Sequence, residues 1–377
     1  MNVLKNSEPL AILKMRVFLF DRNFLTNREI EKLRQGIGPI RICKRTFLAP
    51  FQLDLEKMPA DILSDRFVFQ MNCIMRINGL NLIVCFVLIN HAGIPAMAQA
   101  PAKKKADETP PGKVYIYKKS GGVDRQMEIY FPPGHDPAKA KVPGLIMFHG
   151  GGWTGGTPAQ FRRACEYFAS RGMVTATVSY RMLKKNEIQA LPPGESHKRA
   201  CIIDAKSAIR WFKQHADELG IDPLKIVTGG GSAGGHISTL ATTNPGLNDP
   251  ADDLKTDTSV VAYLLFNPAF TADDAKDSEI DALKHLKASF TPAIVFFGTE
   301  DNWKKGWDAA EKQLMQSGNK TTEVLLAKGL PHGFFNREPW QSMTLIAADS
   351  FLVEQGLLKG SPTLKTPKTD LKLEAAK

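Results

Sequence analysis

The chain has 377 residues, which is enough for one large domain together with additional sequence at its ends. Its formal net charge is +10, but residues 1–100 hold 13 basic and 8 acidic residues, so the remainder is only mildly basic. Because no basic stretch is interleaved with aromatic residues, nucleic acid is excluded as an expected partner. Neither a CxxC nor an HExxH spacing occurs, so no metal site is expected.

A segment near residue 80 has the composition of a secretory signal peptide. No Lys, Arg, Asp or Glu occurs from Ile77 to Ala102, Leu82–Ile89 is an apolar core, and Ala98–Ala100 fits a small-x-small cleavage site. A membrane anchor needs about 20 apolar residues, and polar residues interrupt this run too early. We therefore expect residues 71–100 to be a cleaved leader, and the mature chain to be secreted or periplasmic without a stable membrane span. Residues 1–70 are then expected to be a non-native upstream extension, with a genuine regulatory extension as the alternative.

Beyond a Lys/Pro/Ala-rich linker at residues 101–112, strand-like and helix-like segments alternate over residues 113–358. Such alternation predicts an α/β fold with a mainly parallel sheet covered by helices on both faces. The predicted strands are 113–119 and 125–131, as an opening hairpin, and then 144–148, 173–179, 225–228, 260–266, 293–297 and 323–326. The predicted helices are 158–170, 199–219, 233–242, 304–317 and 340–352. Residues 359–377 are rich in Lys, Pro and Thr and are predicted to be disordered.

Residues 149–153 read His-Gly-Gly-Gly-Trp and directly follow the apolar run 145–148. Glycines in that position let backbone N–H groups approach the negative charge of a tetrahedral intermediate, which is the role of an oxyanion hole. The expected donors are the N–H groups of Gly151, Gly152 and Ala233. The residues expected to support the loop are His149 and Gly150. The alternative is a glycine-rich turn beside a core histidine.

A second glycine-rich stretch, residues 228–236, contains G-x-S-x-G with Ser232 at its centre. An apolar run precedes this stretch and a helix-compatible run follows it. A serine on such a tight strand-to-helix turn is held above the sheet as a nucleophile, and the flanking Gly230 and Gly234 are needed because side chains would not fit. The pattern alone fits a plain turn equally well. The His-Gly-Gly-Gly-Trp loop upstream, which also follows a strand, favours the catalytic interpretation.

Three histidines follow Ser232 along the chain. His332 lies in the loop 329–335 between a strand and a helix, where it can reach over a nucleophile, and it is the predicted base. His236 lies one helical turn beyond Ser232 and is expected to pack beneath the site. His285 lies in a stretch typical of a solvated amphipathic helix.

The acid that orients the histidine should lie between Ser232 and His332 in the chain. The strand 293–297 runs into Gly-Thr-Glu-Asp, which makes Asp301 the predicted acid and leaves Glu300 as an alternative. The role requires a carboxylate that accepts a hydrogen bond from the histidine and so fixes its tautomer. Weaker candidates lie in an apparent insertion and are Asp273, Asp274 and Asp277.

Taken together, HGGGW, GGSAGGH, the GTxD strand end and the PHGFF loop resemble the α/β-hydrolase serine esterases and lipases. The resemblance is closest to bacterial esterases of the hormone-sensitive-lipase-like and acetyl-xylan-esterase-like groups, and it covers residues 113–356. It implies the α/β-hydrolase fold, a triad of Ser232, Asp301 and His332, and no cofactor. Trp153 and Phe334 are expected to line the substrate pocket. Residues 300–303 depart from the pattern, because many relatives have a small residue before the acid, so the shape of that loop stays open.

These features predict a secreted serine carboxylesterase for short acyl esters, with a small-molecule or polysaccharide ester as partner and acetylated polysaccharide as a candidate substrate. One alternative is a serine peptidase of the prolyl-oligopeptidase type, which usually carries a large extra domain that does not fit here. The other is a non-catalytic binding module of the same fold, which an intact triad disfavours. Cys165 and Cys201 lie on different predicted helices and are expected to be buried thiols. The sequence carries no signal for the oligomeric state.

Overall fold

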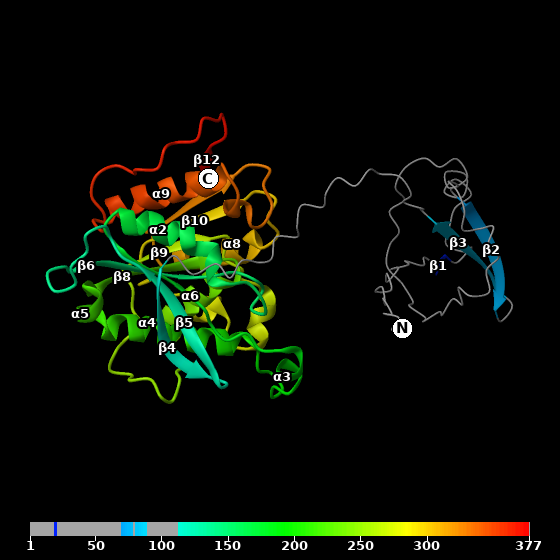
Figure 1. Cartoon of the computed structure of the whole chain (residues 1–377), viewed down its shortest axis with the longest axis horizontal. Helices are drawn as coiled ribbons and strands as arrows, with labels where there is room; N and C mark the ends of the chain where they lie inside the picture. The colour runs from blue at the N-terminus through cyan, green and yellow to red at the C-terminus, as the bar shows by residue number, and fades with distance from the viewer. Residues whose placement is uncertain (1–18, 21–68, 78–79, 89–111, 377) are drawn as a thin grey trace, which may run out of the picture. The chain divides into compact units, whose positions relative to one another are not determined.

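The computed structural model describes residues 19–20, 69–77, 80–88 and 112–376, which fall into two units, Met1–Ala106 and Asp107–Lys377 (Figure 1). The first unit contains three antiparallel strands, β1 (Leu19–Phe20), β2 (Phe69–Ile77) and β3 (Leu80–Leu88), in the order β1-β3-β2. The predicted leader 71–100 is therefore described only where it contributes to β2 and β3. Its remainder, most of the predicted extension 1–70 and the linker up to residue 111 lie outside the described residues.

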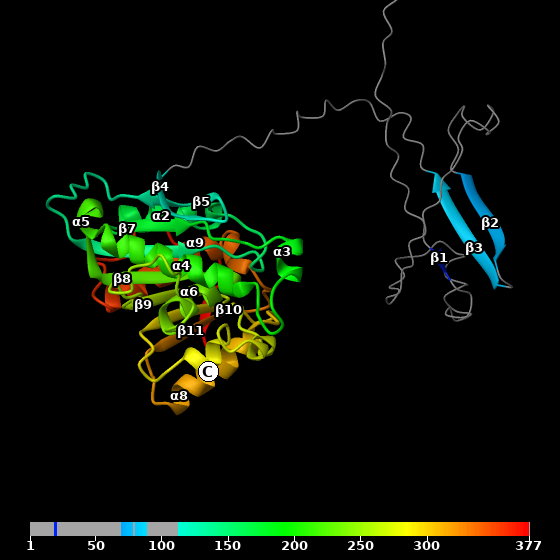
Figure 2. The ribbon, with the colours of Figure 1, turned by 90° about the horizontal axis from the view of Figure 1, so that it is seen from below.

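The second unit is built on a sheet that has nine strands within the described residues, in the order β12-β11-β10-β9-β8-β6-β7-β5-β4. In Figure 2, β4 and β5 lie at one end of this unit, and β10 and β11 lie toward the other. The six central strands pair in parallel, and these are β11, β10, β9, β8, β6 and β7. The remaining strands, β4, β5 and β12, pair antiparallel at the two edges. The predicted mainly parallel sheet with an opening hairpin is thereby confirmed. The strands are β4 (Lys113–Ser120), β5 (Val123–Tyr130), β6 (Val142–Phe148), β7 (Val174–Val178), β8 (Ile221–Gly231), β9 (Ala262–Phe266), β10 (Ala293–Gly298), β11 (Thr322–Ala327) and β12 (Leu373–Ala375).

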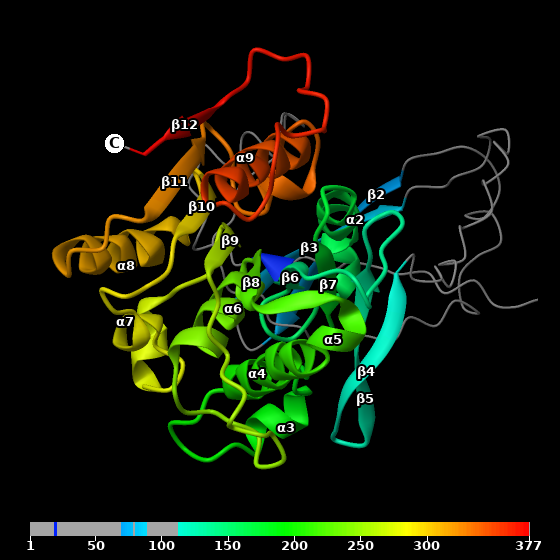
Figure 3. The ribbon, with the colours of Figure 1, turned by 90° about the vertical axis from the view of Figure 1, so that its left-hand side faces the viewer.

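Helices cover both faces of the sheet (Figure 3). α2 and α9 pack on one face, and α4, α6 and α8 pack on the other. The longer helices are α2 (Arg162–Ser170), α4 (Lys198–Gln214), α6 (Ala233–Thr243), α8 (Lys304–Gln316) and α9 (Trp340–Glu354). The shorter elements are α3 (Lys185–Gln189), α5 (Ala216–Leu219), α7 (Ala282–His285) and the 3-10 turns η4 (Pro158–Phe161), η5 (Ala272–Lys276) and η6 (Phe334–Asn336).

The central strands are apolar on both sides because both faces of the sheet are covered. In β10, Ile294 and Phe296 pack toward α2 and α9, whereas Val295 and Phe297 pack toward α4, α6 and α8. All four side chains are almost fully buried. Burying one such side chain contributes about 1.5–3 kcal/mol, so β10 is among the strands that hold the two helical layers together.

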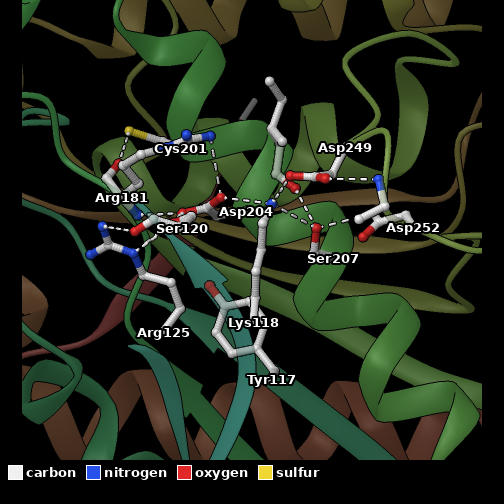
Figure 4. A network of polar contacts seen from close by, with 12 residues as sticks. Tyr117, Lys118, Ser120, Arg125, Arg181, Cys201, Asp204, Ser207, Asp249 and Asp252 are labelled. Carbon is white, nitrogen blue, oxygen red and sulfur yellow. Dashed lines mark hydrogen bonds and ion pairs between the residues drawn. The ribbon is translucent and has the colours of Figure 1, made fainter. Parts of the chain in front are cut away.

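A buried ionic network fixes the edge hairpin β4–β5 to α4 (Figure 4). Its centre is Asp204 of α4, whose fully buried carboxylate forms ion pairs with Lys118 at 3.0 Å and Arg181 at 3.4 Å. Arg181 also donates its backbone N–H to Asp204 at 2.9 Å, and Lys118 makes a second ion pair with Asp249. A buried carboxylate is costly unless it is paired in this way. The network therefore holds a strand, a helix and the loop containing Asp249 in one arrangement.

The C-terminal segment is ordered, which differs from the disorder predicted for residues 359–377. The strand β12 pairs antiparallel with β11, and the backbone carbonyls of Lys359 and Gly360 accept hydrogen bonds from Arg171. Leu364 and Leu373 pack against the core on the side of α2 and α9. The prediction of disorder was wrong because it rested on the Lys/Pro/Thr composition. Two well-spaced leucines and a free sheet edge are enough to anchor the segment.

Cys165 and Cys201 are free and buried, as predicted. The predicted helix 199–219 is divided at His215 into α4 and α5. In the part of the chain that the structure describes, no helix is both long and apolar enough to cross a membrane.

Candidate active site

Ser232 occupies a strained turn between the end of β8 and the start of α6. Its backbone has φ 53° and ψ −118°, a region that costs a non-glycine residue about 1–3 kcal/mol. The surrounding backbone leaves no room for side chains, because a Cβ at Gly230 or Gly234 would lie 2.4 Å or 1.9 Å from the carbonyl oxygen of Phe148. The glycines of the sequence motif are thus required by the close approach of α6 to β6.

The three residues predicted as a triad form one hydrogen-bonded chain. His332 Nε2 lies 2.7 Å from Ser232 Oγ, and His332 Nδ1 lies 2.7 Å from Asp301 Oδ2. A carboxylate can only accept, so Nδ1–H donates to Asp301 and the unprotonated Nε2 can accept the serine proton. The Asp301 carboxylate is fully buried, whereas the His332 side chain is 31% exposed. The other Asp301 oxygen accepts the backbone N–H of Trp303 at 2.9 Å.

The alternative histidines and acids have other partners. His236 is buried and lies against Trp153 and the carbonyl of Ile280, and His285 lies beside the carbonyl of Ser278. Glu300 is exposed. The acids of the insertion pair with basic side chains: Asp273 with Lys276, Asp274 with Lys198, and Asp277 with Arg199.

The predicted oxyanion loop adopts a conformation that needs its glycines. Gly151, Gly152 and Trp153 have φ values of 127°, 62° and 61°, and a Cβ at Gly151 would lie 2.2 Å from the carbonyl oxygen of Gly155. A Cβ on Gly150 would lie 3.2 Å from Ser232 Cβ, so the loop runs directly beside Ser232. Successive backbone N–H groups in such a turn form a concave site for negative charge.

The N–H groups expected to bind the oxyanion are unpaired in the described part of the chain. Within the described residues, the N–H groups of Gly151, Gly152 and Ala233 have no hydrogen-bond acceptor. Ala233 is the first residue of α6, where a helix leaves its N–H groups unpaired and favours negative charge. The arrangement can therefore stabilise negative charge next to the serine hydroxyl.

His149 braces this loop from inside the protein. Its Nδ1 lies 2.7 Å from the carbonyl oxygen of Gly150, its ring stacks on Tyr180 at 4.3 Å, and Tyr180 donates its hydroxyl to the His149 carbonyl at 2.6 Å. Burial lowers the pKa of His149 to about 4, so the ring is neutral at ordinary pH. His149 therefore supports the fold of the loop.

Three residues that the motifs did not reveal connect the loops around Ser232. Asn267 follows β9 with φ 42°, accepts the Gly333 N–H at 3.0 Å and places its Nδ2 3.5 Å from His332 Nε2. Gln160 accepts the Gly150 N–H at 2.6 Å and donates to Asn336 at 3.0 Å. Asn267 could have been found, since polar residues directly after parallel strands gather at the site edge of the sheet. Gln160 and Asn336 carry no comparable sequence signal.

The two residues predicted to line the pocket differ in position. Trp153 lies beside the site, with its ring 6.2 Å from that of Trp303. Phe334 instead packs into the core against Trp340 at 5.8 Å, because η6 turns its side chain toward α9. In the described residues, no group of three or more His, Cys, Asp or Glu side chains could hold a metal ion.

The fold and the Ser232 turn define an α/β-hydrolase, and comparisons with known proteins agree. Residues 127–264 match the BD-FAE family. The chain is 38% identical over 130 residues to the probable carboxylic ester hydrolase LipM of Mycobacterium tuberculosis, a match that covers 34% of this chain and 27% of LipM. It is 31% identical over 121 residues to carboxylesterase NlhH of the same organism, covering 32% of this chain and 34% of NlhH. The matched stretches thus span about a third or less of these curated relatives.

Solved structures extend the similarity to about two thirds of the chain. The apo form of Thermogutta terrifontis esterase 2 is 36% identical, has a TM-score of 0.61, and is covered over 98% of its length by 67% of this chain. The propionate-bound and butyrate-bound forms of that esterase match with TM-scores of 0.60. The chain therefore belongs to the α/β-hydrolase family of serine esterases and lipases.

Proposed function

We propose that this protein is a serine carboxylesterase in which Ser232, His332 and Asp301 act as a catalytic triad. One observation carries the proposal: the unbroken hydrogen-bonded chain from Ser232 through His332 to Asp301, with both distances at 2.7 Å. The N–H groups of Gly151 and Gly152, which have no acceptor within the described residues, add to it.

In the acylation step, Ser232 Oγ attacks the ester carbonyl carbon while His332 Nε2 accepts the serine proton. The carbonyl oxygen becomes an oxyanion, which the N–H groups of Gly151, Gly152 and Ala233 stabilise. Asp301 holds the resulting imidazolium in place. When the tetrahedral intermediate collapses, the bond to the alcohol oxygen breaks and His332 protonates the departing alcohol.

In the deacylation step, water attacks the acyl group on Ser232, and His332 Nε2 takes the proton from this water. The second tetrahedral intermediate expels Ser232 Oγ, which recovers its proton from His332 as the carboxylic acid leaves. The residues named above supply every proton transfer, and the sequence requires no cofactor for it.

For the acyl part, we propose short chains, with acetyl esters of polysaccharides as a candidate class. Support for short chains comes from Thermogutta terrifontis esterase 2, whose solved forms hold propionate or butyrate. Support for polysaccharide comes from the resemblance of the motifs to acetyl-xylan-esterase-like enzymes. A peptidase of the prolyl-oligopeptidase type remains the alternative enzyme, since it uses the same triad.

The deciding experiment compares p-nitrophenyl acetate, p-nitrophenyl octanoate and a proline-containing peptide anilide as substrates of the full chain. We expect rapid acetate turnover, slower octanoate turnover and no peptide cleavage. The Ser232→Ala variant should keep its melting temperature and lose the activity. Paraoxon should label the wild type once, at Ser232, as located by peptide mass. Ester turnover that persists in Ser232→Ala would contradict the proposal, and a folded protein without turnover on any substrate would favour a binding module.

We further propose that the mature enzyme is exported, with residues 71–100 as its leader. The support is the charge-free apolar stretch followed by the small-x-small site at Ala98–Ala100. Amino-terminal sequencing of the protein recovered outside the cytoplasm should give a mature end close to residue 101. A mature end before residue 90 would contradict the proposed leader.

A further inference from the structure

Trp303 is an exposed aromatic side chain next to the proposed triad. It is 37% exposed, which is unusual for a tryptophan beside a folded core, and it directly precedes α8. Its ring lies 6.0 Å from the His332 ring and 6.2 Å from the Trp153 ring, measured between centroids. An exposed indole is thus held at the edge of the site.

The backbone of Trp303 is fixed by the site itself. Its N–H donates to Asp301 Oδ1 at 2.9 Å, and the next residue, Lys304, donates its backbone N–H to the Asp301 carbonyl at 3.1 Å. The two hydrogen bonds position the start of α8 relative to the proposed acid. The indole ring therefore projects from a rigid point of the fold, and a ligand that stacks on it does not have to order a loop.

The ring of Trp303 also rests against a fixed neighbour. Trp153 is buried, donates its indole N–H to His236 Nδ1 at 3.3 Å, and has Lys198 Nζ 3.6 Å from its ring centroid. Lys198 is in turn paired with the buried Asp274. Burial and the nearby Lys198 charge lower the pKa of His236 to about 3, so its Nδ1 stays free to accept the Trp153 N–H. Trp153 is therefore held by His236 and Lys198, and it gives Trp303 a fixed neighbour.

The position of Trp303 indicates which half of an ester it would contact. In the proposed mechanism, His332 Nε2 protonates the departing alcohol, so the alcohol part lies on the His332 side of Ser232. The carbonyl oxygen is expected at Gly151 and Gly152. The Trp303 ring lies 6.0 Å from the ring of His332, the residue that protonates the departing alcohol, so an alcohol that leaves past His332 comes within reach of the indole.

We propose that Trp303 is a stacking surface for the alcohol part of the ester, and that it favours alcohols whose ring has a flat apolar face. A pyranose ring and an aromatic ring share this chemistry, because both can lie flat on an indole. The proposal rests on the proposed esterase function. It adds the identity of the leaving alcohol, which neither the motifs nor the triad specify.

The experiment uses the full chain and three acetates that differ only in the alcohol: a monoacetylated methyl pyranoside, phenyl acetate and ethyl acetate. The variants are Trp303→Ala, Trp303→Phe and, as a control, Met315→Ala, which removes another exposed apolar side chain of α8. Aromatic contacts of this kind correspond to roughly two- to tenfold in equilibrium terms. We expect Trp303→Ala to lower kcat/KM for a ring-bearing acetate, relative to ethyl acetate, by about that factor.

Further readouts separate stacking from a merely structural role. Trp303→Phe should recover most of the preference for the ring, and Met315→Ala should leave the ratio unchanged. The deacylation rate, measured from the p-nitrophenyl acetate burst, should change less than the acylation rate because the alcohol has already left. A loss confined to the pyranoside identifies a sugar as the alcohol, and a loss confined to phenyl acetate identifies an aryl alcohol.

An equal loss on all three acetates, or no loss on any of them, would overturn the proposal. This failure is distinct from failure of the esterase function, which would appear as ethyl acetate hydrolysis that survives Ser232→Ala.

Discussion

The two sides of Ser232 are built by different means. On one side, the oxyanion loop is a backbone structure in which Gly151 and Gly152 take positive φ values of 127° and 62° and a buried His149 braces the turn. On the other side, His332 and Asp301 form a chain of side-chain hydrogen bonds, and the histidine is 31% exposed. Both sides reach the same serine.

This difference determines how each side can fail. A site made of backbone N–H groups depends on free space around the chain and on the φ angles of its residues. A single added methyl group can therefore move these N–H groups. A side-chain relay depends on tautomer and proton position, so an isosteric change can disable it without moving an atom. A substitution that keeps the shape of a side chain but changes its hydrogen bonding should therefore damage the histidine side most. A substitution that keeps the backbone N–H groups but adds volume should damage the oxyanion side most.

The largest effect is expected from Asp301→Asn, which keeps the shape of the histidine side. The amide would donate to His332 Nδ1, and the imidazole proton would move to Nε2, which could then no longer accept the Ser232 proton. We expect kcat to fall about 10⁴-fold while the melting temperature changes little. Steady-state kinetics on p-nitrophenyl acetate, together with thermal unfolding, measure both quantities.

Glu300→Gln is the matched control for this prediction. Glu300 precedes Asp301 in the chain and is exposed, so its substitution should leave kcat near the wild-type value. If Glu300→Gln were as damaging as Asp301→Asn, the assignment of the acid would be wrong.

A smaller effect is expected from Gly151→Ala on the oxyanion side. The added Cβ would lie 2.2 Å from the Gly155 carbonyl oxygen, so the loop must shift and its N–H groups with it. Loss of oxyanion stabilisation typically lowers kcat about 10²–10³-fold, with much less effect on KM. In Gly152→Ala the added Cβ would point into open space. The remaining cost is the backbone strain of an alanine at a φ of 62°. Gly151→Ala should therefore be the more damaging of the two, and the opposite order would contradict this account of the loop.

Acid should destabilise the oxyanion side through His149. The pKa of its buried imidazole is lowered to about 4, whereas an unfolded chain has the ordinary histidine pKa of about 6.5. Between these two pH values, His149 is protonated in the unfolded state but neutral in the folded state. The free energy of unfolding therefore falls as pH falls. The contribution of this group approaches 1.4 kcal/mol per pH unit within that window.

Urea unfolding at several pH values between 7 and 4 measures this slope. His149→Asn removes the titrating group while keeping an N–H that can reach the Gly150 carbonyl. The variant should be less stable at pH 7 and should show a shallower dependence on pH. An unchanged slope would mean that His149 titrates normally in the folded protein.

The same contrast explains what could be predicted from the sequence. The oxyanion loop and the Ser232 turn could be predicted because close backbone approach requires glycine at fixed positions. The alternation of strands and helices predicted the mainly parallel sheet that carries both. For His332 and Asp301, the rule of chain order only reduced the candidates. The loop position of His332 then separated it from His236, and the Gly-Thr-x-Asp strand end separated Asp301 from Glu300. Phe334 illustrates the limit, since the direction of its side chain depends on how η6 docks on α9.

Gln160 belongs to neither side alone, and it gives the smallest predicted effect. Its side chain accepts the Gly150 N–H at 2.6 Å and donates to Asn336 at 3.0 Å, and Asn336 donates to the carbonyl of Gly333, next to His332. Gln160 thus connects the oxyanion loop to the loop that contains His332. Gln160 and Asn336 lie 176 residues apart in the sequence.

Gln160→Leu should lower kcat about tenfold, because one backbone N–H loses its acceptor and the two loops can move apart. Gln160→Glu keeps an acceptor for Gly150 and should recover part of the loss. Inhibition by a boronic acid, which mimics the tetrahedral intermediate, should weaken in parallel with kcat while KM stays nearly constant. If Gln160→Leu lowered only the melting temperature, the bridge would stabilise the fold without positioning the two sides of Ser232 relative to each other.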